Sequence, residues 1–77
     1  MKIVNMKLSS IADVRNFVNI VAKYTMEIDL SSNRYVVDAK SIMGIFSLDL
    51  LNPIQVTAHG EDAECEQFFA EIKDYIV

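Results

Sequence analysis

Two hydrophobic periods alternate along the chain, and their order limits the folds that it can adopt. In three segments, residues 2–8, 26–30 and 54–59, apolar residues occupy every second position, which is typical of strands covered on one face. Residues 34–38, Arg-Tyr-Val-Val-Asp, follow a turn and predict a fourth strand. In residues 11–24 and 61–76 apolar residues recur at steps of three and four, which is typical of amphipathic helices. A short apolar segment, residues 41–47, predicts one more helix.

The order of these elements, β-α-β-β-α-β-α, predicts an α+β fold. Each one-sided element must bury its apolar face, and helices packed on one face of an antiparallel sheet satisfy that requirement. We therefore expect an open-faced sandwich in which three helices cover one face of a four-stranded antiparallel sheet. A chain of 77 residues has room for one such sheet and one layer of helices, so we expect a single domain over residues 1–77.

Local signals support the element boundaries. Ser10 followed three residues later by Asp13 resembles a capping box in which aspartate replaces the usual glutamate, so a helix is predicted to begin there. Residues 31–33, Ser-Ser-Asn, predict the turn of a hairpin. Val36 and Val37 are adjacent in the following strand, so one of them is expected on the less covered face.

Charge and composition exclude several classes of partner. The net charge is −4 and the seven Lys and Arg residues are scattered, so direct binding to nucleic acid is not expected. No apolar run reaches the ~18 residues that span a bilayer, and residues 1–8 alternate charged with apolar, unlike a signal peptide. We therefore expect a cytoplasmic protein that does not insert into a membrane.

Neither a metal nor a cofactor is expected. Cys65 is the single cysteine, which excludes an internal disulfide, and it is predicted to be a small buried hydrophobe on a helix. The aspartates that could suggest a cation site match no known ligand spacing. They are Asp13, Asp29, Asp38 and Asp49, and we expect them to be solvated.

The segment Lys40–Leu48, KSIMGIFSL, together with AKY at 22–24, resembles the HPr family, the histidine-containing phosphocarriers of the bacterial sugar phosphotransferase system. The alignment runs without gaps from about Ser10 to Leu50, and the family has the element order predicted above. The resemblance implies that Ile42, Met43 and Phe46 form an apolar docking patch. Its partners in the family are Enzyme I, a serine kinase and a transcription regulator. The alternative is that most of the apolar residues of this segment are core.

The resemblance also identifies a departure at the start of the first helix. The family has His, Ala, Arg and Pro where this chain has Ser10, Ile11, Ala12 and Asp13. Phosphoryl carriage needs a neutral nucleophilic nitrogen and a cation beside a helix N-terminus. Serine is a poor nucleophile without a base, and Asp13 adds negative charge. Arg15 is a candidate replacement cation, but it lies more than a turn into the helix. No catalytic residue is therefore predicted.

Two further residues have alternative interpretations. Ser41 matches the serine that a kinase phosphorylates in gram-positive members, and a helix N-terminus would stabilise the added charge. The alternative is that Ser41 is only a helix cap. His59, the only histidine, could be a displaced carrier or an ordinary histidine at the exposed end of a strand.

The sequence therefore predicts an HPr-like protein that is not an enzyme and acts as a docking or regulatory module. Two alternatives stay open. One is a true phosphocarrier that uses another residue, and the other is the same fold serving as a homodimer or small-ligand module.

Overall fold

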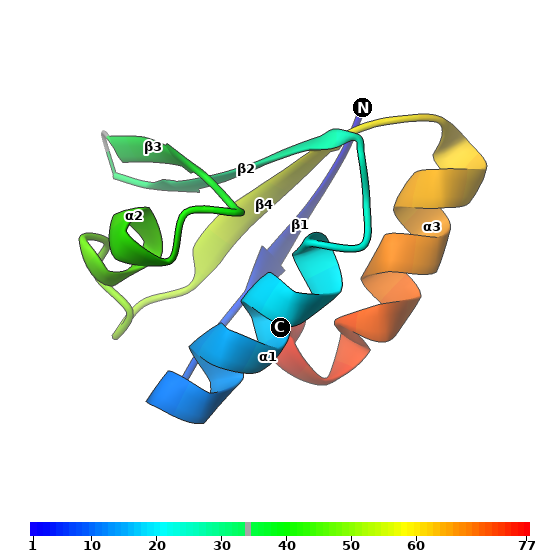
Figure 1. The fold of residues 1–77 in the computed structure, drawn as a ribbon. Coiled ribbons are helices and arrows are strands. Elements are labelled where there is room, and N and C mark those ends of the chain that lie inside the picture. Colours follow the sequence, from blue (N-terminus) through cyan, green and yellow to red (C-terminus); the bar gives the residue numbers. More distant parts are fainter. Residues whose placement is uncertain (34) are drawn as a thin grey trace.

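One antiparallel sheet and one layer of helices make up the fold. The computed structural model describes residues 1–33 and 35–77. Within those residues the four strands are β1 (Lys2–Met6), β2 (Glu27–Ser32), β3 (Tyr35–Asp38) and β4 (Ile54–His59). The three α-helices of the same residues are α1 (Ile11–Val21), α2 (Ile42–Phe46) and α3 (Asp62–Glu71). The helices lie on one side of the sheet (Figure 1), and the predicted open-faced sandwich is confirmed.

β4 lies inside the sheet, whose order is β1-β4-β2-β3. Val56 of β4 stands opposite Val4 of β1 and Leu30 of β2, and all three face the helices. The rings of Phe17 in α1 and Phe68 in α3 pack on this side with centroids 6.2 Å apart, and both side chains are fully buried. The core therefore fills the space between the sheet and the helices.

The other face of the sheet is uncovered in the described residues and largely polar. Thr57 of β4 stands opposite Ile3 and Asp29, all of them at least partly exposed. Val36 points to this face and is exposed, whereas Val37 stands opposite Leu30 and is half-buried. The expectation that the two valines differ in coverage is confirmed.

Two elements end earlier than the periodicity predicts. β1 ends at Met6 rather than Leu8, although the Leu8 side chain is still buried in the core. α1 ends at Val21 rather than Tyr24, because a tight turn follows in which the Tyr24 N–H donates to the Val21 carbonyl at 3.0 Å. The Tyr24 ring packs edge-on against Phe68 from this turn. Its apolar character continues the helical spacing in the sequence, and for that reason the predicted helix was too long.

The hairpin turn is shorter than predicted. Ser31 and Ser32, expected in the turn, belong to β2, because they pair with Val36 and Tyr35 across the hairpin. Asn33 has a φ of 56°, in the left-handed region that asparagine tolerates. The predicted first residue of the next strand, residue 34, lies outside the described residues.

The C-terminal segment is not one helix. α3 ends at Glu71 and a short 3₁₀ helix, Lys73–Tyr75, follows. The prediction of a helical Ile76 is wrong, since Ile76 forms a bridge with Met6 of β1. Backbone hydrogen bonds from Lys7 N to the Tyr75 oxygen at 2.8 Å and from Val77 N to the Asn5 oxygen at 3.0 Å pin this tail to β1.

A polar cluster joins the C-terminal ends of α1 and α3. The Tyr24 hydroxyl and the Lys23 ammonium both donate to the Glu71 carboxylate. Burial, followed by the hydrogen bond to Glu71, raises the pKa of Tyr24 to about 12. The hydrogen bonds from Lys23 and Tyr24 hold the pKa of Glu71 below its usual value.

Candidate functional site

The start of α1 is closed by its own side chains. Ser10 is the N-cap, with a φ of −148°, and its Oγ accepts a hydrogen bond from the Asp13 N–H at 3.1 Å. Asp13 Oδ2 in turn accepts from the Ser9 N–H at 2.9 Å. The predicted cap at Ser10 is confirmed. In a capping box the carboxylate would accept from the N–H of Ser10, but here it accepts from the N–H of Ser9. Both side chains are thus used within the backbone turn.

The histidine and Ser10 lie at opposite ends of the sheet. β1 leads into α1 from Met6, which pairs with Ile54 at the start of β4. His59 is the last residue of β4 and pairs with Glu27. Its Nε2 lies 2.9 Å from Asp29 Oδ2, and its side chain is exposed. The imidazole therefore cannot act on a group bound at the start of α1.

The short helix α2 begins at a serine in the same way. Ser41 is its N-cap, and Ser41 Oγ accepts from the Gly44 N–H at 3.1 Å. The predicted segment 41–47 holds a helix over Ile42–Phe46 with a serine cap at each end. A Cβ on Gly44 would lie 3.1 Å from Ser41 Oγ and 3.2 Å from Val37 Cβ, so glycine lets α2 approach β3 closely.

α2 buries one apolar side chain and leaves three at the surface. Ile45 is fully buried, whereas Ile42, Met43 and Phe46 are 37%, 78% and 43% exposed. We call these three residues the α2 patch. The alternative, in which Ile42, Ile45 and Phe46 are mostly core, is confirmed only for Ile45. An exposed methionine beside an aromatic ring is a surface suited to binding another protein.

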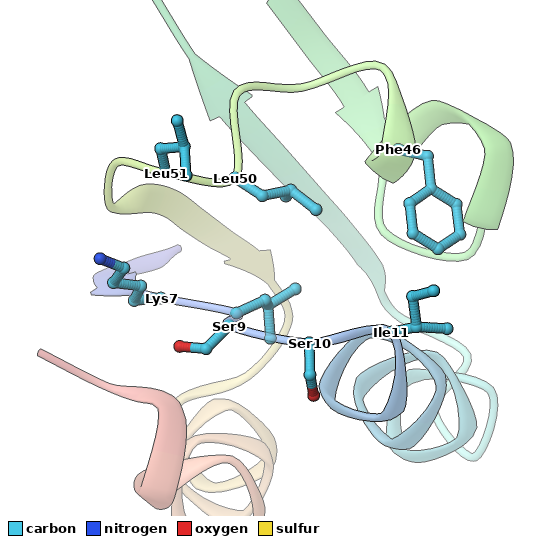
Figure 2. A pocket seen from close by; sticks show the side chains of 8 residues that line it. Lys7, Ser9, Ser10, Ile11, Phe46, Leu50 and Leu51 are labelled. Carbon is cyan, nitrogen blue, oxygen red and sulfur yellow. The ribbon is translucent and has the colours of Figure 1, made fainter.

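A groove joins the α2 patch to the start of α1. It has a volume of about 410 Å³ and lies between residues 7–11 and the segment that contains Phe46, Leu50 and Leu51. Figure 2 shows the side chains of Ile11 and Phe46 pointing toward one another and Leu50 reaching into the space between the segments. No sequence pattern predicted this groove, because it lies between segments that are distant in the sequence. The only local signal was the pair Leu50-Leu51 in a connection.

The sequence raised two other candidate groups, a single cysteine and a set of acidic residues. Cys65 is buried, as predicted, and its Sγ lies 3.6 Å from the Ala58 carbonyl oxygen. Among residues 1–33 and 35–77, His, Cys, Asp and Glu side chains nowhere gather in the threes that a metal ion needs. No helix within the same residues has the length and apolar character to cross a membrane.

The comparison with known families identifies one match over most of the chain. The model of the PTS HPr component phosphorylation site matches residues 13–77. No curated protein sequence matches the chain.

Three solved structures are similar in fold and sequence. HPr-C-His from Thermoanaerobacter tengcongensis has a TM-score of 0.79 and 28% identity, covering 96% of this chain and 89% of its own. Phosphocarrier protein HPr from Bacillus anthracis has a TM-score of 0.67 and 30% identity, covering 91% and 92%. The catabolite repression protein Crh of Bacillus subtilis, described as a dimer with a swapped domain, has a TM-score of 0.65 and 26% identity, covering 96% and 88%.

Proposed function

The chain belongs to the HPr family of the sugar phosphotransferase system, and from this premise we propose that it is a member that docks on or regulates protein partners without carrying a phosphoryl group. In this proposal residues 1–77 act as one cytoplasmic, non-enzymatic domain. HPr-family phosphocarriers carry a phosphoryl group and bind protein partners of the system. We propose that this chain retains the binding of partners and has lost the carriage of the phosphoryl group.

The observation that carries the proposal is the closed start of α1. By the resemblance of residues 10–50 to the family, the carrier histidine corresponds to Ser10, whose Oγ already accepts from the Asp13 N–H at 3.1 Å. A phosphoryl group there would meet the Asp13 carboxylate, and like charges close together repel. His59, the single histidine of the sequence, lies at the other end of the sheet. Serine without a base is a weak nucleophile.

The docking half is supported by the α2 patch. Ile42, Met43 and Phe46 are exposed on a helix that Ile45 anchors to the core. Interfaces are enriched in Met and aromatic side chains, and such residues often dominate binding energy. We propose this patch as the surface for Enzyme I, a serine kinase or a transcription regulator. Phosphorylation of Ser41, directly beside the patch, would regulate that docking by adding charge.

A second candidate function is a homodimer. The similarity to Crh, whose structure is described as a dimer with a swapped domain, favours it. In that case the protein would form a concentration-dependent dimer and would not bind the partners of the phosphotransferase system. Sedimentation velocity over a range of concentrations, with and without Enzyme I, distinguishes the two functions.

The decisive experiment is incubation with Enzyme I and phosphoenolpyruvate. We expect no acid-labile phosphate on the chain, together with measurable binding of Enzyme I. The matched variant replaces the four aligned residues by those of the family: Ser10→His, Ile11→Ala, Ala12→Arg and Asp13→Pro. It should gain acid-labile phosphate, which shows that the assay and the alignment are sound. Acid-labile phosphate on the unmodified chain would overturn the proposal.

A further inference from the structure

The groove beside α1 has the size and the walls of a small-molecule site. Its volume of about 410 Å³ falls within the ~300–1,000 Å³ of pockets that hold small ligands. Leu8, Ile11, Phe46 and Leu50 supply apolar walls, and the exposed Leu51 lies at the rim. In Figure 2 the Ser10 hydroxyl points away from Leu50, so it does not make the floor polar.

One end of the groove carries a positive charge that no neighbour neutralises. Lys7 lines the groove and is exposed, and it forms no ion pair with any of the residues that the structure describes. Two carboxylates of the adjoining turns accept hydrogen bonds from their own turns and form no ion pair with Lys7. Asp13 accepts from the Ser9 N–H, while Asp49 accepts from the Leu51 N–H at 3.0 Å and from the Asn52 amide at 2.8 Å. The groove thus combines an apolar interior with a cationic end.

A compact, highly charged anion such as phosphate does not suit this groove. Two of the N–H groups at the start of α1, those of Ser9 and Asp13, already donate to side chains of the turn, which leaves fewer donors for such an anion. Apolar walls reward a ligand with an aliphatic body, and a single ammonium matches a single carboxylate. Charge and shape together select one chemical class, an aliphatic chain with one anionic head.

We propose that the groove between residues 7–11 and 46–51 binds a medium-chain aliphatic carboxylate, with the chain against Ile11, Phe46 and Leu50 and the head toward Lys7. This site goes beyond the proposed docking role and does not depend on it. A bound carboxylate would cover Phe46, which is part of the α2 patch, so occupancy of the groove and protein docking at the patch would exclude one another.

The test is a titration of the full chain with sodium octanoate. Calorimetry measures the affinity, and the NMR chemical shifts of the backbone amides locate the site. We expect saturable shifts confined to residues 7–11 and 46–51. From butanoate to octanoate the affinity should rise by up to about fourfold for each added methylene, because each buried methylene contributes about 0.8 kcal/mol. Octanoate should bind more tightly than the neutral 1-octanol, since only octanoate can pair with Lys7.

Two variants localise the site without touching the core. Leu51→Ser removes an apolar rim side chain that is 83% exposed and should weaken octanoate binding by about fourfold, the effect of about one buried methylene. Lys7→Gln should weaken it by about two- to fivefold, as expected for an exposed ion pair. The matched controls Val36→Ser, on the open sheet face, and Lys73→Gln, on the 3₁₀ helix, should bind octanoate as the unmodified chain does.

Three results would overturn the proposal. The first is the absence of saturable octanoate binding in the groove, and the second is equal octanoate affinity in the Leu51→Ser or Lys7→Gln variant. The third is a change in the amide chemical shifts of the groove residues on addition of an amphipathic peptide but not of octanoate. That result would assign the groove to a protein interface.

Discussion

The first turns of α1 and α2 share a serine cap and differ in the residue whose N–H donates to that cap. In both helices the side-chain oxygen of a serine, Ser10 or Ser41, accepts from the N–H three residues later at 3.1 Å. In α1 that N–H belongs to Asp13, whose carboxylate returns to the backbone of Ser9. In α2 it belongs to Gly44, and the first turn of α2 holds no acidic residue.

This difference determines what each helix start can accept. Negative charge near a helix N-terminus is favourable, and at α1 Asp13 already supplies it. A phosphate on Ser10 would add charge beside that carboxylate. A phosphate on Ser41 would meet backbone N–H groups with Lys40 as the preceding residue. Although the two caps have the same geometry, we expect phosphorylation at Ser41 and not at Ser10.

The largest expected effect is all-or-none. Treatment with the family's serine kinase and ATP should add one phosphate, located at Ser41 by peptide mass analysis. Ser41→Ala should gain no mass, and Ser10→Ala should gain the same mass as the unmodified chain. Phosphate found on Ser10 would break the comparison between the two helix starts.

The next effect separates the two faces of α2. Ile45→Ala should lower the free energy of unfolding by about 2–5 kcal/mol, because it empties a fully buried position. Phe46→Ala should lower it less, since Phe46 is 43% exposed, but it should weaken Enzyme I binding by about tenfold or more. Urea denaturation and calorimetric titration measure the two quantities. Equal binding by Phe46→Ala and the unmodified chain would argue against docking through the α2 patch.

A smaller effect compares the caps themselves. Ser10→Ala should cost about 1 kcal/mol in the free energy of unfolding, because α1 loses a cap and carries buried residues such as Phe17. Ser41→Ala should cost less, because α2 has only 5 residues and is held mainly by Ile45. Chemical denaturation of the two variants gives the difference. A larger loss for Ser41→Ala would show that α2 depends on its cap more than on its anchor.

The smallest effect concerns the other end of α1 and appears only at alkaline pH. Since the pKa of Tyr24 is raised from 10.0 to about 12, the folded chain retains the tyrosine proton longer than the unfolded chain. The resulting stabilisation is fully present below pH 10 and is lost as the pH rises through about 12. Tyr24→Phe should flatten this decline in urea denaturation curves measured on either side of pH 10. An unchanged decline would mean that other groups cause it.

The sequence was sufficient for the elements and for the anchors of the core, because these follow from local periodicity. Val14 and Val21 recur at helical spacing in the sequence and are buried on α1, whereas Ile11, the first residue of the same pattern, is 65% exposed. Local patterns misplaced the ends of helices where an apolar residue packs on the rest of the protein from outside the helix. Tyr24 packs on Phe68 from a turn, and Ile76 pairs with β1.

The features that the sequence did not predict depend on register and on long-range packing. The pair His59–Asp29 exists because β4 pairs with β2, a partnership that no local pattern specifies. The groove likewise depends on the contact of residues 7–11 with the connection after α2. For the candidate site, the sequence predicted roles for Ser10 and for the α2 patch, which stay predictions, but it did not predict the groove between them.

The position of β4 has a consequence for the timing of folding. β1 pairs along its length only with β4, and β2 also pairs with β4, so residues 54–59 are required before the two halves of the sheet can join. During synthesis on the ribosome, β1 must wait without a partner strand until more than two thirds of the chain has emerged. Loop closure over such a distance slows folding, so the nascent chain depends on α1 and the β2–β3 hairpin for its early structure.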